Sequence, residues 1–138
     1  MNAVDTNILV YVHDPRDTAK QATAASLVKN LVDGILLWQV AVEYLANAHK
    51  LKSHGFDLNR AFQVVDGLCQ VWKLAAPTPG VLVRCQKLMN SISISYWDAL
   101  IVAGSLEAGA ARLYSEDINP GGKIDGLEII NPFAKPTN

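Results

Sequence analysis

The sequence predicts an α/β fold with three α/β/α layers, in which helices cover both faces of a short and mostly parallel central sheet. Two observations indicate this class. Short apolar runs, typical of buried strands, alternate along the chain with helical patterns of ten or more residues. Half of the 138 residues are hydrophobic and 18% are charged, which is typical of a compact globule. We therefore expect residues 1–138 to form a single domain.

The first third of the chain predicts a strand, a helical turn, a helix and a second strand. Ala3-Val4 forms a short strand that breaks at Asp5-Thr6-Asn7, after which the chain restarts as a helical turn. Residues 18–32 are rich in Ala, Leu and Lys and are followed by Gly34, which predicts a helix with a glycine stop. The brief apolar run over 35–38 predicts a second buried strand.

The middle of the chain predicts three helices. Helical spacing runs from Gln39 to about Ser53, with positions 41, 44, 45, 48 and 51 on one apolar face. A second helix opens at Asp57 and continues toward Trp72. The turn sequence Pro77-Thr78-Pro79-Gly80 then separates this helix from a third helical segment over 81–89.

The last third predicts the most hydrophobic helix and the closing strands. This helix runs from Ser95 to Ala108 and is ended by Gly109. A strand-like run over 112–115, a turn at Pro120-Gly121-Gly122 and a closing strand over 127–130 complete the chain.

Composition excludes several classes of protein. The longest apolar stretches are far shorter than the roughly 20 residues that a membrane-spanning helix needs, and residues 1–5 lack the basic and apolar regions of a signal peptide. We therefore expect a cytoplasmic protein. Cys69 and Cys85 are too few for a zinc motif and lie in apolar helical patterns, so we expect both to be reduced thiols in the core.

The charge balance gives no general attraction to nucleic acid. Twelve basic and 13 acidic residues leave a net charge of −1, so a polyanion would have to be held locally. Candidate basic stretches are His49 to Arg60 (with Lys50, Lys52 and His54) and Arg16 with Lys20. A solvated helix end explains the first stretch equally well.

Four acidic residues, Asp5, Glu43, Asp98 and Asp117, begin or end different apolar segments. Each has an ordinary explanation by itself. Asp5 can cap the helical turn that follows it, and Asp98 stands three residues after Ser95 in the spacing of a capping box. Glu43 falls on the polar stripe of its helix, and Asp117 can close a surface loop.

Together these carboxylates suggest a metal site. Asp5 and Asp117 each follow a predicted strand, and ligands of parallel sheets bind at the carboxyl ends of the strands. Two carboxylates about 4 Å apart repel by roughly 4 kcal/mol at an effective dielectric constant near 20, so three or four need a cation. Oxygen ligands without paired His or Cys favour Mg²⁺ or Mn²⁺ over zinc.

Four motifs carry a resemblance to a known family. They are Val4-Asp5-Thr6-Asn7-Ile8-Leu9, Val42-Glu43-Tyr44-Leu45, Tyr96-Trp97-Asp98-Ala99-Leu100-Ile101-Val102-Ala103, and Leu113-Tyr114-Ser115-Glu116-Asp117. In this order, and over nearly the whole chain, they resemble the PIN-domain ribonucleases, in particular the VapC-type toxins of bacterial and archaeal toxin–antitoxin pairs. The resemblance implies a PIN-like fold.

The resemblance also implies roles for individual residues. Asp5, Glu43, Asp98 and Asp117 would form an acidic catalytic quartet, of which Asp5, Asp98 and Asp117 would be metal ligands. Thr6, Asn7, Ser115 and Glu116 would support them, with Glu116 a possible substitute for Asp117.

The implied activity is metal-dependent hydrolysis of RNA phosphodiester bonds, with Glu43 positioning or deprotonating a water molecule. The implied partners are an antitoxin, as in a type II toxin–antitoxin system, and a second copy of the chain. Apolar residues between Gln39 and Trp72 would form either a groove for an amphipathic helix or ordinary core; they are Tyr44, Phe56, Leu58, Phe62 and Trp72.

Two alternatives stay open at this point. The first is a phosphohydrolase with Asp5 as nucleophile, which is weakened because Asp5 is followed by Thr6-Asn7 and not by a second Asp two positions on. The second is a non-catalytic protein-interaction module in which the acidic residues only cap helices.

Overall fold

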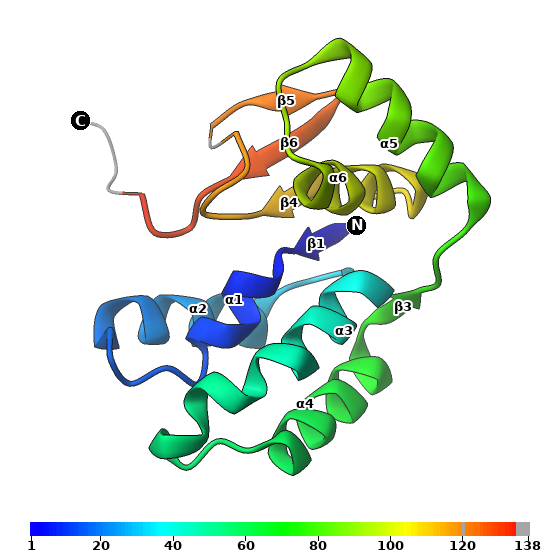
Figure 1. Cartoon of the computed structure of the whole chain (residues 1–138). Coiled ribbons are helices and arrows are strands. Elements are labelled where there is room, and N and C mark those ends of the chain that lie inside the picture. Colours follow the sequence, from blue (N-terminus) through cyan, green and yellow to red (C-terminus); the bar gives the residue numbers. More distant parts are fainter. Residues whose placement is uncertain (120, 135–138) are drawn as a thin grey trace.

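The computed structural model describes residues 1–119 and 121–134. The strands are β1 (Asn2–Val4), β2 (Gly34–Leu37), β3 (Lys73–Ala75), β4 (Arg112–Tyr114), β5 (Lys123–Ile124) and β6 (Leu127–Ile130). They form one sheet in the order β3-β2-β1-β4-β6-β5 (Figure 1). All neighbouring pairs are parallel except β5, which runs antiparallel to β6. The predicted mostly parallel sheet is therefore confirmed.

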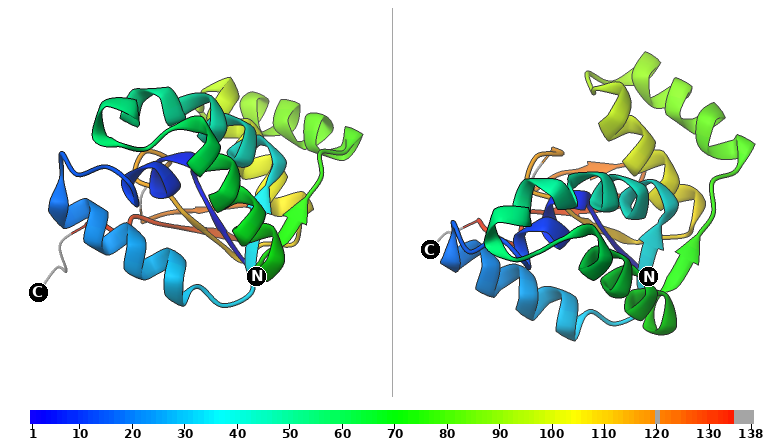
Figure 2. Two further views of the ribbon diagram at one scale, coloured as in Figure 1. Left: turned by 90° about the horizontal axis from the view of Figure 1, so that it is seen from below. Right: turned by 60° about the horizontal axis from the view of Figure 1, so that its bottom comes forward.

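The helices are α1 (Thr6–Tyr11), α2 (Thr18–Asn30), α3 (Trp38–Asn47), the 3₁₀ helix η1 (Ala48–His54), α4 (Leu58–Val71), α5 (Pro79–Ser91) and α6 (Tyr96–Glu107). α1 contacts both α2 and α3. Seen from below, α2 lies on one side of the strands and α3 on the other, as Figure 2 shows. Helices thus cover both faces of the sheet, as predicted.

Helix ends follow local capping chemistry. Asp17 and Asp57 are the N-caps of α2 and α4, and the side chain of each accepts a hydrogen bond from a backbone amide three residues on. Ser95 caps α6 in the same way. Gly109 follows α6 with φ +83°, a conformation that glycine adopts without strain. Of the predicted turn at 120–122, Pro120 lies outside the described residues.

Two strands and two helices differ from the predictions. The helix predicted over 18–32 ends at Asn30, and Gly34, its predicted glycine stop, is instead the first residue of β2. β3 and β5 were not predicted, because three and two residues with an exposed Lys in each show no apolar periodicity. Both lie at edges of the sheet, where pairing with a neighbouring strand defines them. The helix predicted over 39–53 is α-helical only to Asn47 and continues as η1.

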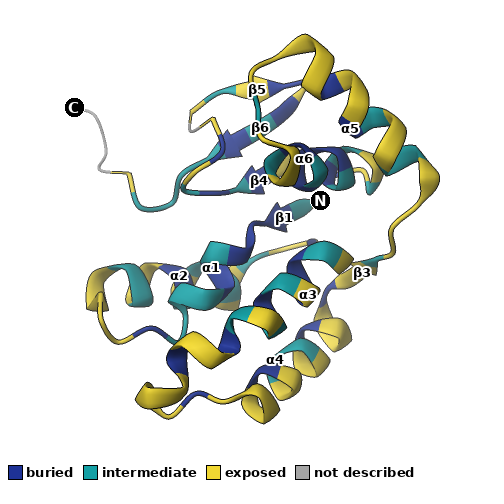
Figure 3. Cartoon of the chain, viewed as in Figure 1, coloured by how far each residue is buried: buried dark blue, intermediate teal, exposed yellow. Residues whose placement is uncertain are grey.

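The core lies between the sheet and the helices, where buried segments adjoin in Figure 3. Every residue of β2 is buried, and Val40, Ala41 and Tyr44 of α3 form the buried face of that helix. Gly34 is in close contact with the Trp72 ring, because a Cβ atom built on it would lie 2.5 Å from that ring. The side chain of Trp72 thus occupies the space that other residues would need at position 34.

One prediction about the core needs correction, and one alternative that the sequence left open is decided residue by residue. Cys85 is buried, but Cys69 is exposed, because it follows Leu68 on α4 and faces away from the buried side of that helix. Of the apolar residues between 39 and 72, Tyr44, Phe56 and Trp72 belong to the core, whereas Leu58 and Phe62 are about half exposed. Across residues 1–119 and 121–134, every helix is too short or too polar to cross a bilayer.

Candidate active site

The candidate site lies at the carboxyl ends of the two central strands. β1 and β4 pair in parallel with Val4 opposite Tyr114, and the amide of Asp5 donates to the Tyr114 carbonyl at 2.8 Å. Asp5 follows β1 directly, and the Ser115-Glu116-Asp117 segment follows β4. The strand pairing therefore brings both acidic segments to the same edge of the sheet, as the sequence predicted.

All four carboxylates of the predicted quartet line one cavity of about 160 Å³. Each comes from a different segment: Asp5 precedes α1, Glu43 lies within α3, Asp98 lies in the first turn of α6, and Asp117 lies in the loop after β4. Thr6, Asn7, Asn47, Trp97 and Ile101 complete the lining. The fold thus gathers residues that are far apart in the sequence.

Asp5 is the most deeply placed of these acids and is 8% exposed. Its Oδ1 accepts from the amide of Thr6 at 2.7 Å, which makes Asp5 the N-cap of α1, and its Oδ2 accepts from the Ser115 hydroxyl at 2.8 Å. Burial raises the pKa of Asp5 to about 6; the two hydrogen bonds oppose this change, and the charges of Asp98 and Glu43 add to it. A cation beside Asp5 would relieve both unfavourable effects.

Glu43 is held in place by hydrogen bonds to both carboxylate oxygens. Thr6 Oγ1 donates to its Oε2 at 2.6 Å, and Gln39 Nε2 donates to its Oε1 at 2.7 Å. Asn47 Nδ2 donates to the Glu43 backbone carbonyl at 2.8 Å. The solvated position that the helical pattern suggested for Glu43 is therefore wrong, because α1 and α3 pack together and bring Thr6 against it.

Ser115 connects the two strand-end acids. Its hydroxyl, fully buried, donates to Asp5 and accepts from the amides of Asp117 at 3.3 Å and Ile118 at 3.2 Å. The side-chain amide of Asn7 donates to Asp117 Oδ2. Asp117 is thus attached to the first helix and to the buried serine.

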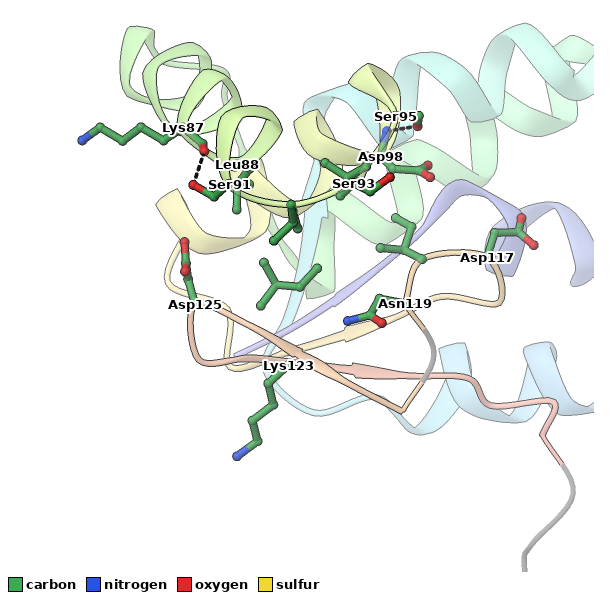
Figure 4. Close-up of a pocket in the computed structure, with 14 residues that line it drawn as sticks. Lys87, Leu88, Ser91, Ser93, Ser95, Asp98, Asp117, Asn119, Lys123 and Asp125 are labelled. Atoms are coloured by element: carbon green, nitrogen blue, oxygen red, sulfur yellow. Dashed lines mark hydrogen bonds between the residues drawn. The ribbon is translucent and has the colours of Figure 1, made fainter.

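Asp98 faces Asp117 at the mouth of a larger groove. The Ser95 hydroxyl accepts from the Asp98 amide at 3.2 Å, so this half of the predicted capping box is formed, while the Asp98 side chain lines the cavity. A groove of about 900 Å³ runs from these two acids past the end of α5 toward β5 (Figure 4). The acidic cavity therefore adjoins this groove, and Asp98 and Asp117 line both.

Glu116 lies apart from the quartet. Its Oε2 accepts from the Tyr11 hydroxyl at 2.7 Å, and its Oε1 pairs with Lys20 Nζ. Burial alone would raise the pKa of Glu116, but the hydrogen bonds from Lys20 and Tyr11 outweigh it and leave that pKa lowered. Glu116 is thus already neutralised by Lys20, away from the cavity that Asp117 lines.

The predicted basic stretches do not reach the cavity in the described part of the chain. Arg16 pairs with Asp14 at 2.8 Å, and Lys20 is engaged with Glu116. His49, Lys50, Lys52 and His54 lie on or at the end of η1, and Arg60 donates to the Gly55 carbonyl at 3.0 Å.

Three residues near the acids were not singled out from the sequence. Gln39 and Asn47 stand four positions before and after Glu43, which is the spacing of one helical turn and was the available signal. Trp97 precedes Asp98 directly, but its exposure depends on tertiary packing and left no mark in the sequence.

The donor set suits a hard divalent cation in its chemistry. The cavity offers carboxylate oxygens from four residues, and Asp5 carries the raised pKa of a buried acid with acidic neighbours. Among residues 1–119 and 121–134, no three His, Cys, Asp or Glu side chains stand as a ready-made metal cage. Glu43 and Asp117 are hydrogen-bonded to Thr6 and Asn7, respectively, and each carboxylate oxygen keeps a lone pair for a further ligand.

Comparison with known proteins agrees with this geometry. The family model described as PIN domain matches residues 3–120. A toxin–antitoxin complex from Klebsiella pneumoniae superposes with a TM-score of 0.71 at 15% identity, covering 96% of this chain and 98% of that chain. No curated protein matches the sequence.

Two further solved structures share the fold. VapC20 of Mycobacterium tuberculosis, described as a sarcin–ricin loop cleaving toxin, has a TM-score of 0.64 at 17% identity and covers 86% of this chain and 92% of its own. VapBC-1 from nontypeable Haemophilus influenzae has a TM-score of 0.64 at 17% identity, with coverages of 95% and 97%. At these identities the likeness establishes the fold.

Proposed function

The chain belongs to the PIN domain family, and on this premise we propose that it is a metal-dependent endoribonuclease that hydrolyses RNA phosphodiester bonds. One observation carries the proposal: four carboxylates from four separate segments line a single cavity at the carboxyl edge of the sheet. We take the nuclease domain to span residues 1–138.

Asp5, Asp98 and Asp117 are the proposed ligands of Mg²⁺ or Mn²⁺. Bound there, such an ion supplies a Lewis acid that lowers the pKa of water and offsets charge on the reacting phosphate. Asp5 is fixed by Thr6 and Ser115, and Asp117 by Asn7 and Ser115, so these neighbours keep the carboxylates close to one another. Of the four residues expected to support the ligands, we propose that Thr6, Asn7 and Ser115 do so. Glu116 is paired with Lys20 instead.

Glu43 is the proposed group that orients the attacking water. Thr6 and Gln39 each donate to one of its oxygens, which fixes the plane of the carboxylate at the cavity wall. Each carboxylate oxygen keeps a further lone pair that can accept from a water molecule. In this proposal Glu43 orients the water molecule or accepts a proton from it, while Asp5, Asp98 and Asp117 would hold the cation.

Each oxygen of Asp5 accepts one hydrogen bond and keeps a lone pair that can coordinate a cation. The alternative in which Asp5 is a nucleophile is disfavoured by the sequence, because Thr6-Asn7 follows Asp5 in place of a second Asp two positions on. Trapping of a phosphoaspartate at Asp5 would support that alternative. Metal-dependent cleavage of RNA would exclude the interaction-module alternative.

The proposed biological setting is suggested by the proteins that share the fold. They include toxins and toxin–antitoxin complexes of the same fold, with nearly complete coverage of both chains. These likenesses support the proposal that this chain is the cytoplasmic toxin of a type II pair, bound by an antitoxin and paired with a second copy of itself.

The test is cleavage of a single-stranded RNA and a structured RNA by the purified protein with Mg²⁺, with Mn²⁺ and with EDTA. Cleavage should require the divalent ion, and Asp98→Ala should lower the rate at least about 100-fold, since it removes a charged ligand at the reacting phosphate. A matched control is Asp66→Asn, which changes an exposed acid of α4. Cleavage that persists in EDTA or in Asp98→Ala would exclude the proposed chemistry.

A further inference from the structure

Trp97 lines the acidic cavity but has no part in the hydrolysis proposed above. Its side chain is 63% exposed, although large aromatic side chains usually bury most of their surface. It lines the acidic cavity together with the four carboxylates, and it also lines a neighbouring apolar groove of about 710 Å³. The indole therefore stands where the metal-binding acids meet an apolar surface.

The position of Trp97 is fixed relative to the acids. It lies in the first turn of α6, between the N-cap Ser95 and Asp98. The side-chain amide of Gln39 lies 3.5 Å from the Trp97 carbonyl and donates to Glu43 at 2.7 Å. The Tyr96 ring meets the indole edge-on, with 5.1 Å between ring centroids. Gln39 thus links the backbone of Trp97 to Glu43, and the Tyr96 ring contacts the indole itself.

We propose that Trp97 is the platform on which an unpaired RNA base stacks while its phosphate is held at the acidic cavity. This inference rests on the proposed ribonuclease function and deepens it. Trp97 and Asp98 both line the acidic cavity, so a nucleotide whose phosphate is held by a cation at the acids has its base within reach of the indole.

Charge explains why such a platform is needed. The chain has a net charge of −1 and the cavity is acidic, so general attraction to the RNA backbone contributes little. Stacking on an aromatic side chain binds any unpaired base and does not depend on a positive surface. A paired base is already stacked in its helix, so the platform selects single-stranded or looped RNA.

A nucleotide suits this position better than an apolar protein surface does. Its base can stack on the indole, and its phosphate can bind a cation at the acidic residues. A nucleotide therefore suits both the apolar groove and the acidic cavity, both of which Trp97 lines. An apolar side chain of a partner would satisfy the indole but would remove water from the neighbouring carboxylates at a cost. The exposed Trp38, which lines the apolar groove and not the acidic cavity, is the useful comparison.

The experiment uses a short single-stranded RNA with one cleavage site and the same RNA with an abasic residue in turn on each side of that site. Stacking on an aromatic ring contributes about 1–3 kcal/mol per base, so Trp97→Ala should raise KM by roughly 5- to 150-fold while kcat stays within about threefold. Trp97→Phe should retain most of the affinity. Val71→Ala, at a 75% exposed position of α4, and Trp38→Ala should leave KM unchanged.

The abasic RNA distinguishes stacking from a structural role of Trp97, because a structural role would not make the effect of Trp97→Ala depend on the presence of the base. For the wild type, removal of the stacked base should raise the Kd by about as much as Trp97→Ala raises it for the intact RNA. For Trp97→Ala, removal of the same base should raise the Kd only slightly further, because both changes remove the same contact. Binding is measured by fluorescence anisotropy with Mg²⁺ in a Glu43→Gln background, which keeps the three proposed ligands and removes the water-orienting carboxylate, so this coupling is tested even if no RNA is cut.

The outcomes separate the two proposals. If the wild type binds RNA with the predicted coupling but does not cleave it, the ribonuclease function fails and the stacking contact stands. If RNA is cleaved with an unchanged KM in Trp97→Ala, or if the abasic and protein changes are additive, the stacking contact is overturned and the ribonuclease stands. Trp97→Ala that dissociates a dimer in sedimentation, without the coupling, would make the indole a protein contact and would also overturn it.

Discussion

At the scale of single residues, Asp5 combines a structural and a chemical role. It caps α1 through the Thr6 amide and accepts from the buried Ser115 hydroxyl, yet burial and the nearby Asp98 and Glu43 disfavour its charge. The two hydrogen bonds position the carboxylate and favour its charge, but burial outweighs them, so the ionised form of Asp5 remains costly. A site of this kind gives up stability for the ability to bind a cation.

This cost predicts the effect of Asp5→Asn on the metal-free protein. The pKa of Asp5 is raised from 3.8 to about 6, so the folded state binds the proton more tightly and loses stability as the pH rises through this window. At pH values above about 6, this shift of the Asp5 pKa lowers the free energy of unfolding by roughly 3 kcal/mol. Asp5→Asn should therefore be more stable than the wild type at pH 8 in EDTA, and the advantage should vanish near pH 4.

Thermal unfolding at a series of pH values measures this effect. Mg²⁺ should raise the Tm of the wild type at neutral pH and leave the Tm of Asp5→Asn unchanged, because the variant lacks a charged ligand. Asp66→Asn serves as the control at an exposed acidic position. A pH-independent difference between Asp5→Asn and the wild type would contradict the assignment of the raised pKa to Asp5.

At the scale of helices and strands, two glycines illustrate how packing decides the meaning of a residue. Gly34 begins β2 beneath the Trp72 ring, and Gly104 lies in the middle of α6. A Cβ atom at Gly34 would lie 2.5 Å from that ring, whereas one at Gly104 would meet Leu37 at 3.7 Å, an ordinary van der Waals distance. From the sequence, Gly34 was expected to stop the preceding helix and Gly104 to lie within a helix; only the packing shows how much space each position leaves for a side chain.

Alanine at the two positions should have opposite effects on stability. Gly34→Ala forces the Trp72 ring to move and should lower the free energy of unfolding by about 1–3 kcal/mol, the usual cost of overpacking. Gly104→Ala should raise it by up to about 1 kcal/mol, because alanine has the higher helix propensity and the space exists. Urea denaturation of both variants checks this, and the same sign for both would refute the packing argument.

The predicted elements succeeded where the signal was local. The central strands β1, β2, β4 and β6, the start of α4 and the ends of α6 were recognisable from apolar runs, the Asp57 and Ser95 caps and the Gly109 stop, whereas the predicted stop of α2 at Gly34 was wrong. β3 and β5 were not, because an edge strand of two or three residues is defined by the strand it pairs with. The change from α3 to η1 at Ala48 was likewise invisible in the apolar spacing.

At the scale of the whole molecule, contacts between distant segments hold the site together. Lys20 of α2 pairs with Glu116 in the loop after β4, and its Nζ lies 5.0 Å from the Tyr11 ring centroid and 5.5 Å from that of Phe133. Tyr11 and Phe133 in turn meet edge-on at 5.1 Å. This cluster, Tyr11, Lys20, Glu116 and Phe133, joins α1 and α2 to the loop that carries Asp117.

Lys20→Met tests the contribution of this cluster. It keeps the apolar stem and removes the charge, so the Tm should fall modestly at low salt, and the fall should shrink at about 1 M salt. Because the pKa of Glu116 is lowered from 4.5, the stabilisation is present at neutral pH and is lost as the pH falls below that value. A Tm difference between the variant and the wild type that is unaffected by salt and acid would exclude an electrostatic role for the pair.

The sequence by itself determined the α/β class, the central strands and the placement of Asp5 and Asp117 at one edge, because apolar periodicity and capping depend on residues a few positions apart. Tertiary structure alone decided that Thr6 meets Glu43 across 37 positions, that Glu116 pairs with Lys20, and that the Trp97 indole is exposed beside the acids. These contacts depend on how helices pack across the sheet. Packing over such separations reflects the shapes of all the buried side chains together, and no local pattern records it.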